Sequence, residues 1–426
     1  RLAGDPKTTG ATECCVGGYQ SAVAATCTAY SEDAPSCNAL RRPLIAGDED
    51  TDASCGVTCA IAWMENSVTA DWWGITSSAD GTKLAATAWS GKIWTSSNSG
   101  ASWTEDTSIG ATKDWSGITS SADGTKLAAT VWGGNIWTSS NSGASWTSHP
   151  NGQNIYWKSI TSSSDGTKLA ATVQDGKIWT SNDSGATWTE DNSITGTKEW
   201  RTITSSEDGT KLATVVNNGN IWTSDDSGAT WTEVTHPRQW DCRSNGQCYT
   251  EGPKAWVAIT SSADGTKLAA VVQGGNIWTS SNSGYTWMED TSIGETKAWL
   301  AITSSVDGTK LAAVAYPNIW TSDDSGATWT EDTTTGAGKY WRVITSSADG
   351  AKLAAAAWSD NIWTKGDTPT HYASGTECLP YTETAQSCNS IRTPFTAGDN
   401  DTNAICGDNC TMEEYASEGN CIAYSI

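Results

Sequence analysis

The tetrapeptide Ile-Thr-Ser-Ser recurs seven times in this chain of 426 residues, and this repetition limits the possible folds more than any other feature. Its isoleucine lies at positions 75, 118, 160, 203, 259, 302 and 344, a spacing of 42 or 43 residues with one longer step of 56. Within each repeat, short β-prone runs alternate with Asp-Gly, Gly-Gly and Asn-Ser-Gly turns, as in successive hairpins. In the first repeat this pattern predicts strands near 72–77, 83–88, 92–96 and 101–106. Four strands in about 42 residues fit one blade of a β-propeller.

Tryptophan supports this layout, because 26 residues are Trp whereas only one is Phe. Trp recurs on the first, third and fourth predicted strands, and we interpret these side chains as packing groups between blades rather than ligand contacts. The seventh repeat lacks a fourth strand after Trp363, but the segment Trp63-Met64-Glu65 resembles Trp287-Met288-Glu289. We therefore expect an all-β, seven-bladed β-propeller over residues 60–364. An N-terminal strand would close it and so remove the exposed sheet edges.

The turn between the third and fourth strands carries the motif Ser-x-Asn/Asp-x-Gly-x-Ser/Thr-Trp, whose first copy runs from Ser96 to Trp103. Asn or Asp can accept hydrogen bonds from the backbone that follows, and Gly tolerates a left-handed conformation. The motif resembles the Asp-box (BNR) repeat of sialidases, xyloglucan-cleaving glycosidases, sortilin-type receptors and photosystem II assembly-factor propellers. The resemblance covers residues 60–364 and implies a propeller fold. It implies no particular function, because the box is structural in those families.

The residues do not favour catalysis. The resemblance to Asp-box sialidases would imply three arginines that hold a substrate carboxylate, together with a Tyr–Glu pair and an Asp. The predicted propeller has only Arg201, Arg238, Arg243 and Arg342, and no Arg-Ile-Pro sequence occurs. Acidic pairs such as Glu105-Asp106 recur around the ring, whereas a catalytic pair needs two different environments. We therefore expect a non-enzymatic protein, with a two-carboxylate glycosidase as the least favoured alternative.

Propeller topology predicts a binding face. The turns between second and third strands share one face with the loops between blades. Aromatic residues occupy this turn in four neighbouring blades, at Trp89, Trp132, Tyr316 and Trp358. Exposed aromatic side chains can stack on sugar rings or bind a protein partner. The alternative is that these side chains fold over the blade edges and pack locally.

Two cysteine-rich modules flank the predicted propeller, at 1–59 and 365–426. Four cysteines have the same spacing in both modules, and the residues between them also match. Modules of this size need covalent staples, so we interpret the cysteines as disulfide-bonded rather than as zinc ligands. The cysteines are Cys27, Cys37, Cys55 and Cys59 in the first module and Cys378, Cys388, Cys406 and Cys410 in the second, while Cys242 and Cys248 are expected to bridge a hairpin in the insertion between the fourth and fifth repeats.

The remaining cysteines, Cys14, Cys15 and Cys421, suggest links between chains. The sequence around Cys421 also echoes that around Cys27, so a further module would begin there. Head-to-tail assembly of such units gives an open fibre when the rotation does not close. We expect an extracellular structural or adhesive protein, a self-associating subunit of a filament, surface appendage or matrix. The alternative is a monomeric, lectin-like propeller that binds carbohydrate or protein.

Charge and composition narrow the partners and the location. Lys and Arg total 25 against 48 Asp and Glu, and the net charge of −23 disfavours a nucleic-acid partner. No apolar run is long enough for a membrane helix, and the cysteine content indicates an oxidising, secreted or cell-surface location. Asparagines in glycosylation sequences are Asn182, Asn400 and Asn409.

Calcium is the one metal that the sequence suggests. Oxygen ligands alternate with other residues in each module, as at the start of a calcium loop. They are Asp48, Asp50 and Asp52 in the first module and Asp399, Asp401 and Asn403 in the second. The alternative is a solvated acidic turn, because the later ligands of an EF-hand are missing.

Overall fold

The computed structural model describes residues 63–150, 155–234, 253–335 and 338–366, and the backbone of two short strands, β29 (Tyr372–Ser374) and β30 (Glu377–Leu379). Every helix or strand assigned in this part of the chain is a β-strand, which confirms the expected all-β class there. The side chains of all cysteines, the calcium candidates, Asn400 and Asn409 lie outside the described residues. The division into a propeller and two modules therefore stays a prediction.

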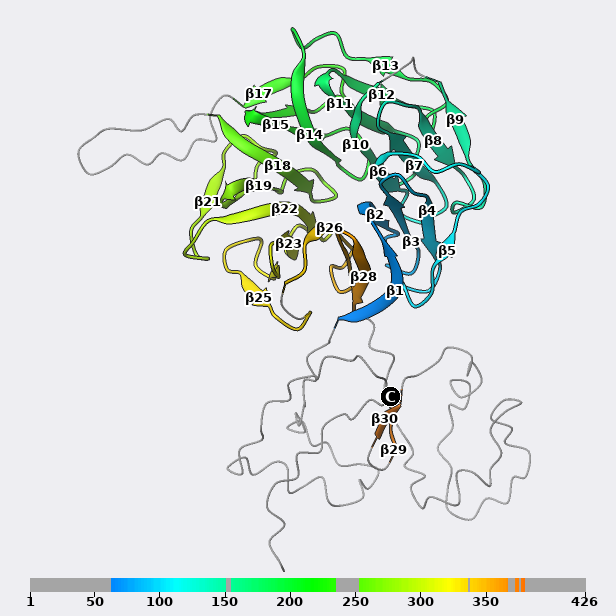
Figure 1. Ribbon diagram of the computed structural model, residues 1–426. Helices are drawn as coiled ribbons and strands as arrows, with labels where there is room; N and C mark the ends of the chain where they lie inside the picture. Colours follow the sequence, from blue (N-terminus) through cyan, green and yellow to red (C-terminus); the bar gives the residue numbers. More distant parts are fainter. Residues whose placement is uncertain are drawn as a thin grey trace, which may run out of the picture. The chain divides into compact units, whose positions relative to one another are not determined.

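The strands follow one another in antiparallel groups of four (Figure 1). The first strands are β2 (Trp72–Ser77), β6 (Trp115–Ser120), β10 (Trp157–Ser162), β14 (Lys198–Ser205), β18 (Lys254–Ser261), β22 (Lys297–Ser304) and β26 (Trp341–Ser346). The second strands are β3 (Leu84–Ala88), β7 (Leu127–Val131), β11 (Leu169–Gly176), β15 (Leu212–Gly219), β19 (Leu268–Gly275), β23 (Leu311–Ala315) and β27 (Leu353–Ala357). The third strands are β4 (Ile93–Ser96), β8 (Ile136–Ser139), β12 (Ile178–Ser181), β16 (Ile221–Ser224), β20 (Ile277–Ser280), β24 (Ile319–Ser322) and β28 (Asp360–Lys365).

The fourth strands are short, and one of them comes from the other end of the described chain. They are β5 (Thr104–Glu105), β9 (Thr147–His149), β13 (Thr189–Glu190), β17 (Thr232–Val234), β21 (Met288–Asp290), β25 (Thr330–Asp332) and β1 (Met64–Ala70). Strand β1 pairs with β28, with Met64 opposite Thr364 and Ala70 opposite Asp360, so the predicted closing strand is confirmed. The blue and orange ribbons of these two strands lie side by side in Figure 1.

The first strands contact one another in a closed cycle, β2 with β6, then β10, β14, β18, β22 and β26, which returns to β2. A ring of backbone hydrogen bonds accompanies this cycle at the turns that follow these strands. The amide of Ala79 donates to the carbonyl oxygen of Ala122 at 2.7 Å, each group repeats the contact, and Ala348 finally donates to Ala79 at 2.7 Å. The contacts join the groups without relying on side chains.

The two kinds of turn share faces as the topology predicts. On one face, the amide of Ser99, after the third strand, donates to the carbonyl oxygen of Thr82, after the first strand, at 2.8 Å. On the other face, the amide of Trp89, after the second strand, donates to the carbonyl oxygen of Asp71, in the loop before β2, at 2.7 Å. The turns that the sequence assigns to one face therefore lie together in the structure.

Tryptophan fills the space between groups, as the repeat predicts. The first-strand residues are at most 1% exposed, and each meets the third-strand Trp of its own group edge-on, with ring centroids 5.9–6.5 Å apart. The indole of Trp200 also donates to the carbonyl oxygen of Gly176 in the preceding group, at 3.1 Å. Trp72, Trp157 and Trp299 make the same kind of bond. These side chains therefore hold one group against the next.

The motif between third and fourth strands forms a tight hydrogen-bonded turn. In one copy, Asp183 accepts from the amide of Thr187 at 2.8 Å and from its hydroxyl at 2.6 Å, while Gly185 donates to the Ser181 hydroxyl at 2.9 Å. Gly185 has φ of 87°, and an added Cβ would lie 2.8 Å from the Thr138 side chain of the preceding group. The turn takes up residues that the sequence assigned to the fourth strand, so β5 begins at Thr104 rather than near 101.

A second set of aspartates stabilises the turns after the first strands. The carboxylate of Asp80 accepts from the hydroxyl of Ser78 at 2.6 Å and from the amide and hydroxyl of Thr82. The Ser78 hydroxyl and the Thr82 amide are the main causes that lower the pKa of Asp80 to about 2. The same bonds lower the pKa to about 2 at Asp123, Asp165, Asp208, Asp264 and Asp307.

These aspartates predict how stability changes with acid. Their folded pKa lies below the unfolded value of 3.8, so their contribution is complete above about pH 4 and is lost as pH falls through about 2. We expect the melting temperature of the protein, followed by circular dichroism, to stay level down to about pH 4 and then to fall steeply. A transition centred above pH 5 would show that these turns do not control acid unfolding.

Candidate functional site

One position breaks the symmetry of the ring. The sequence around it is nearly constant, Trp-x-x-Ile-Thr-Ser, but the residue after the Trp differs between groups. In chain order it is Trp73, Ser116, Lys158, Arg201, Val257, Leu300 and Arg342. The pairing with the second strand shifts register here in every group, for example between Trp157 and Ser159. A β-bulge re-aims a side chain and is common beside binding sites.

Trp73 is the centre of a run of aromatic rings. Its ring centroid lies 4.8 Å from that of Trp89 and 5.6 Å from that of Trp358, which belongs to the neighbouring group. Trp89 continues the run to Trp132 at 6.4 Å, and Trp132 continues it to Tyr156 at 5.1 Å. The run therefore crosses from the last group over the first to the third.

Two cations lie on these rings. The guanidinium carbon of Arg342 is 3.8 Å from the ring centroid of Trp73 and 5.6 Å from that of Trp358. The ammonium nitrogen of Lys158 lies 5.7 Å from the ring centroids of both Trp73 and Trp132. Such contacts stabilise a cation, most of all where water is scarce.

A third cation, Arg201, is close enough to interact electrostatically with both. Burial is the largest cause that lowers the pKa of Lys158, and together with the charges of Arg201 and Arg342 it brings this pKa to about 8, against a smaller opposing effect of Glu199. Burial and the Arg201 charge also lower the pKa of Arg342. Arg201 forms an ion pair with Glu199 at 3.1 Å, and its Nε atom is buried without a hydrogen-bond partner among the described residues.

We call Trp73, Trp89, Trp132, Trp358, Lys158, Arg201 and Arg342 the aromatic–cationic cluster. It gathers three positive groups in a chain whose net charge is strongly negative. Glu199 is a carboxylate whose charge acts on Lys158, and it raises the pKa of Lys158 and so opposes the overall lowering. The arrangement can stack a flat or ring-shaped ligand and attract a negative group.

The cluster brings together three of the four aromatic residues that the sequence singled out. Trp358 is 38% exposed, whereas Trp89 and Trp132 are half-buried, so local packing and partial exposure coexist. Tyr316, 48% exposed, stacks instead on Tyr340 with ring centroids 4.6 Å apart, and the Tyr340 carbonyl oxygen accepts from the Trp358 amide at 2.8 Å.

Sequence reasoning missed Trp73 and the three cations as a group. The signal was present as a strongly variable position directly after the constant first-strand Trp. The variable position alone does not show which way its side chain points, because the regular alternation assumed for a strand does not reveal a bulge.

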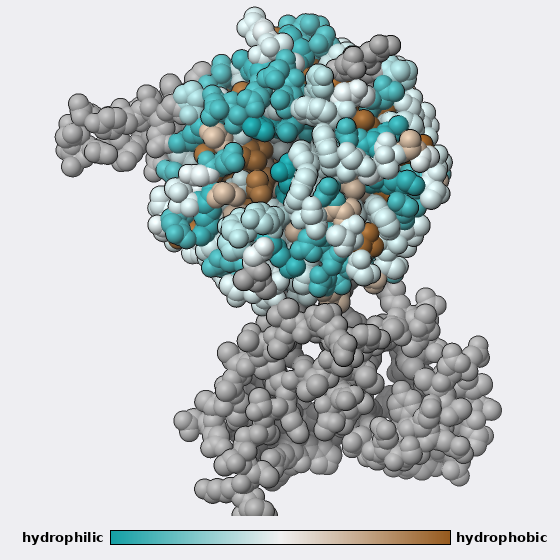
Figure 2. All heavy atoms as spheres, viewed as in Figure 1, coloured by the Kyte–Doolittle hydropathy of each residue, from teal (hydrophilic) through white to brown (hydrophobic). Residues whose placement is uncertain are grey.

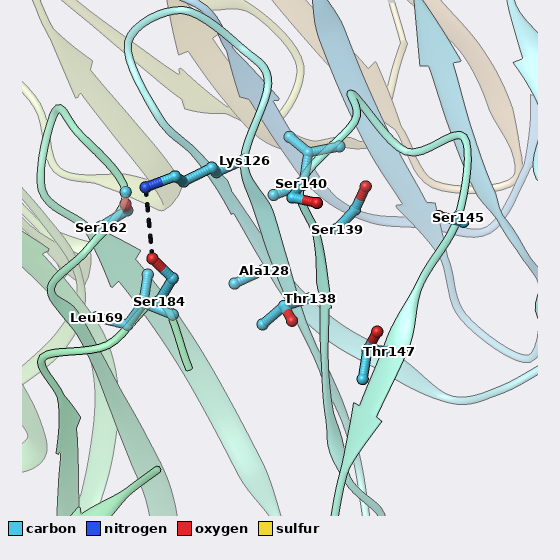
Figure 3. A pocket seen from close by; sticks show the side chains of 12 residues that line it. Lys126, Ala128, Thr138, Ser139, Ser140, Ser145, Thr147, Ser162, Leu169 and Ser184 are labelled. Atoms are coloured by element: carbon cyan, nitrogen blue, oxygen red, sulfur yellow. Dashed lines mark hydrogen bonds between the residues drawn. The ribbon is translucent and has the colours of Figure 1, made fainter. Parts of the chain in front are cut away.

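A pocket of about 200 Å³ lies between the group β6–β9 and the group β10–β13 (Figure 3). Hydroxyl groups line it, and Lys126 Nζ donates to the Ser184 hydroxyl at 3.4 Å. The same contact joins Lys168 to Ser227 at 3.2 Å in the next group, so it belongs to the repeat. The pocket therefore offers no group that the rest of the ring lacks.

The propeller face seen in Figure 2 is mostly hydrophilic, and its apolar areas are small and separate. Asn182 is exposed on the turn between β12 and β13, where an enzyme could reach it. The described residues contain no group of three His, Cys, Asp or Glu side chains placed to hold a metal ion. Nor do they include a helix suited to crossing a membrane.

Comparison by sequence finds no relative, since no family model and no curated protein matches the chain. Comparison by structure finds several β-propellers. YCF48 bound to D1 peptide matches with a TM-score of 0.56 at 13% identity, over 71% of this chain and 96% of that chain. YCF48 from Cyanidioschyzon merolae matches with a TM-score of 0.54 at 15% identity, over 72% of this chain and 98% of that chain.

An enzyme is also among the similar structures. The GH74 xyloglucanase from Xanthomonas campestris matches with a TM-score of 0.55 at 15% identity, over 74% of this chain and 55% of that chain. These likenesses establish a β-propeller fold for the chain. At such low identity they show the fold alone, and they do not decide whether this propeller is an enzyme.

Proposed function

We propose that the chain is an extracellular structural or adhesive protein, a subunit of a self-assembling filament, surface appendage or matrix. We infer that its strand groups are the seven blades of a closed, Asp-box type ring, carried between two disulfide-rich modules that mediate assembly. The observation that carries this proposal is the identical cysteine spacing of the two flanking modules. Like modules on both sides of one rigid unit suit head-to-tail growth.

The described carboxylates support a non-enzymatic role. The aspartates with strongly lowered pKa accept hydrogen bonds from hydroxyl and amide donors within turns. These bonds keep the carboxylates ionised and use their oxygens to stabilise the turns. The acidic residues of the fourth strands, such as Glu105, lie at the outer edge of their groups and recur around the ring. A glycosidase would need a carboxylate pair with two different environments. We identify no such pair among the described residues that would favour the glycosidase alternative.

Electron microscopy of the native material, with and without reductant, tests this function. We expect regular fibres that shorten or dissolve on reduction, because Cys14, Cys15 and Cys421 would link neighbouring chains. Replacing all three by serine should give the same loss of fibres without reductant. Isolated particles under both conditions would contradict the filament role.

A second candidate function is lectin-like binding by the aromatic–cationic cluster. The favouring observation is the contact of Trp73 with rings and cations from several groups. Binding and assembly are compatible, because an adhesive filament needs a recognition surface on its displayed unit.

A further inference from the structure

The cations of the aromatic–cationic cluster are poorly compensated. Within the described residues, Lys158 and Arg342 form no ion pair, and their contacts are with aromatic rings. Arg201 has Glu199 as its ion-pair partner, and its Nε atom stays buried without a partner. All three side chains are half-buried, and charges that are partly removed from water are costly unless they are paired and hydrogen-bonded. A negative ligand would supply the missing partner.

The cluster is also the place where the ring departs from its repeat. Ser116, Val257 and Leu300 occupy the same bulge in other groups and carry no charge, so the fold itself does not require a cation there. Packing alone therefore does not explain three positive residues at this position. Lys158 and Arg342 lie on the Trp73 ring, and Arg201 is close enough to interact electrostatically with both, an arrangement that is best explained by a ligand.

The aromatic rings narrow the ligand class. Trp358 is 38% exposed and Tyr156 is 48% exposed, and both lie at the ends of the run that passes through Trp73. Amphipathic rings of this kind stack on the apolar face of a sugar, while their polar atoms remain available for hydrogen bonds. Arg342 presents a planar fork suited to a carboxylate.

We propose that the aromatic–cationic cluster binds an acidic saccharide, with a uronic acid carboxylate held by Arg342, Lys158 and Arg201 and a sugar ring stacked on the neighbouring tryptophans. This inference rests on the second candidate function and not on filament assembly. The acidic remainder of the chain repels such a ligand, so the cluster is the place where it is attracted.

Titration calorimetry of the full chain with trigalacturonate, and with its neutral analogue galactotriose, tests the proposal. We expect trigalacturonate to bind at least tenfold more tightly than galactotriose. Arg342→Gln should weaken trigalacturonate binding at least tenfold, and Arg342→Lys should restore part of it. Lys198→Gln is the matched control, because Lys198 lies 4.8 Å from the Trp222 ring centroid, outside the cluster, and should leave binding unchanged.

The pH dependence provides a readout that a purely structural role would not change. The charged groups that face Lys158 are Arg201 and Glu199 on β14 and Arg342 on β26. Trigalacturonate binding should weaken as pH rises through about 8, where Lys158 loses its proton, and Lys158→Arg should remove this dependence.

Each outcome of the experiment is decisive. Equal binding of both sugars would overturn the acidic ligand and leave a lectin-like propeller. Binding of neither sugar, with wild-type circular dichroism, would overturn the saccharide site, while the fibre experiment would still decide the structural function. Tighter binding of a glutamate-rich peptide than of trigalacturonate would replace the saccharide by a protein partner and so overturn the proposal.

Discussion

Replacing Trp299 by alanine is expected to lower the free energy of unfolding by about 4 kcal/mol. Trp299 is 0% exposed, it meets Trp320 edge-on at 6.4 Å, and its indole donates to the Gly275 carbonyl oxygen of the preceding group at 3.1 Å. Alanine would leave a large cavity and an unpaired carbonyl group at the contact between two groups. Guanidinium-induced unfolding of the full chain, followed by Trp fluorescence and circular dichroism, measures the change.

Two variants distinguish the effect of the cavity on stability from the effect of the lost hydrogen bond. Trp299→Phe keeps a ring and loses the donor, so its effect should be clearly smaller than that of alanine. Trp329→Ala is the matched control, because Trp329 is half-buried and its indole nitrogen has no partner among the described residues. If Trp329→Ala cost as much as Trp299→Ala, the first-strand Trp would not be the main link between groups.

Replacing Asp332 by alanine is expected to cost about 2 kcal/mol, because it would remove a buried carboxylate that pairs with the half-buried Lys365 and with the Trp63 indole. Its carboxylate accepts from Lys365 Nζ at 2.6 Å and from the Trp63 indole at 2.9 Å. Burial raises the pKa of Asp332, but the hydrogen bonds from Lys365, Thr334 and Trp63 outweigh burial, and the pKa is lowered overall. The carboxylate therefore ties residues near both ends of the described chain to β25.

The control for Asp332 is the equivalent residue of the first group. Asp106 directly follows β5, whereas Asp332 is the last residue of β25, and the partner identified for the Asp106 carboxylate is the nearby amide of Ser108 at 2.7 Å. Asp106→Ala should therefore cost less than half as much as Asp332→Ala in the same denaturation experiment. Equal costs would mean that the contacts of Asp332 with Trp63 and Lys365 contribute no more to closure than the local bond of Asp106 does. A loss confined to Asp332→Ala should be accompanied by faster amide exchange in β1, the strand released by the change.

In the filament subunit that we propose, the contacts of Asp332 would help to keep the ring closed. Strand β1 closes the last group by pairing with β28, and an open edge there would be free to pair with other chains. The Asp332 contacts add side-chain links to that closure. If the chain does assemble through its flanks, force would reach the ring through these strands, and the Asp332 contacts would resist their separation.

The local structure of this propeller was predictable because the residues that determine each turn and strand lie within the same repeat. Hairpin turns and the buried Trp positions recur at steps of 42 or 43 residues with one longer step of 56, and each depends on neighbours in sequence. The closing strand was also predictable, since Trp63 continues the register of the fourth-strand tryptophans. The fourth strand of the first group was predicted too long, because the Asn98 turn takes residues up to Trp103.

The candidate site was predictable only in part. Trp89, Trp132 and Trp358 were found from their turn position, but Trp73, Lys158, Arg201 and Arg342 were not seen as a group. The last two are 141 residues apart, and ring closure is what places β26 beside β2. The bulge then turns each side chain away from the alternation that a strand pattern assumes. Repetition in the sequence thus determined the scaffold, whereas closure of the ring and the bulges in its first strands decided which of the non-repeating residues meet.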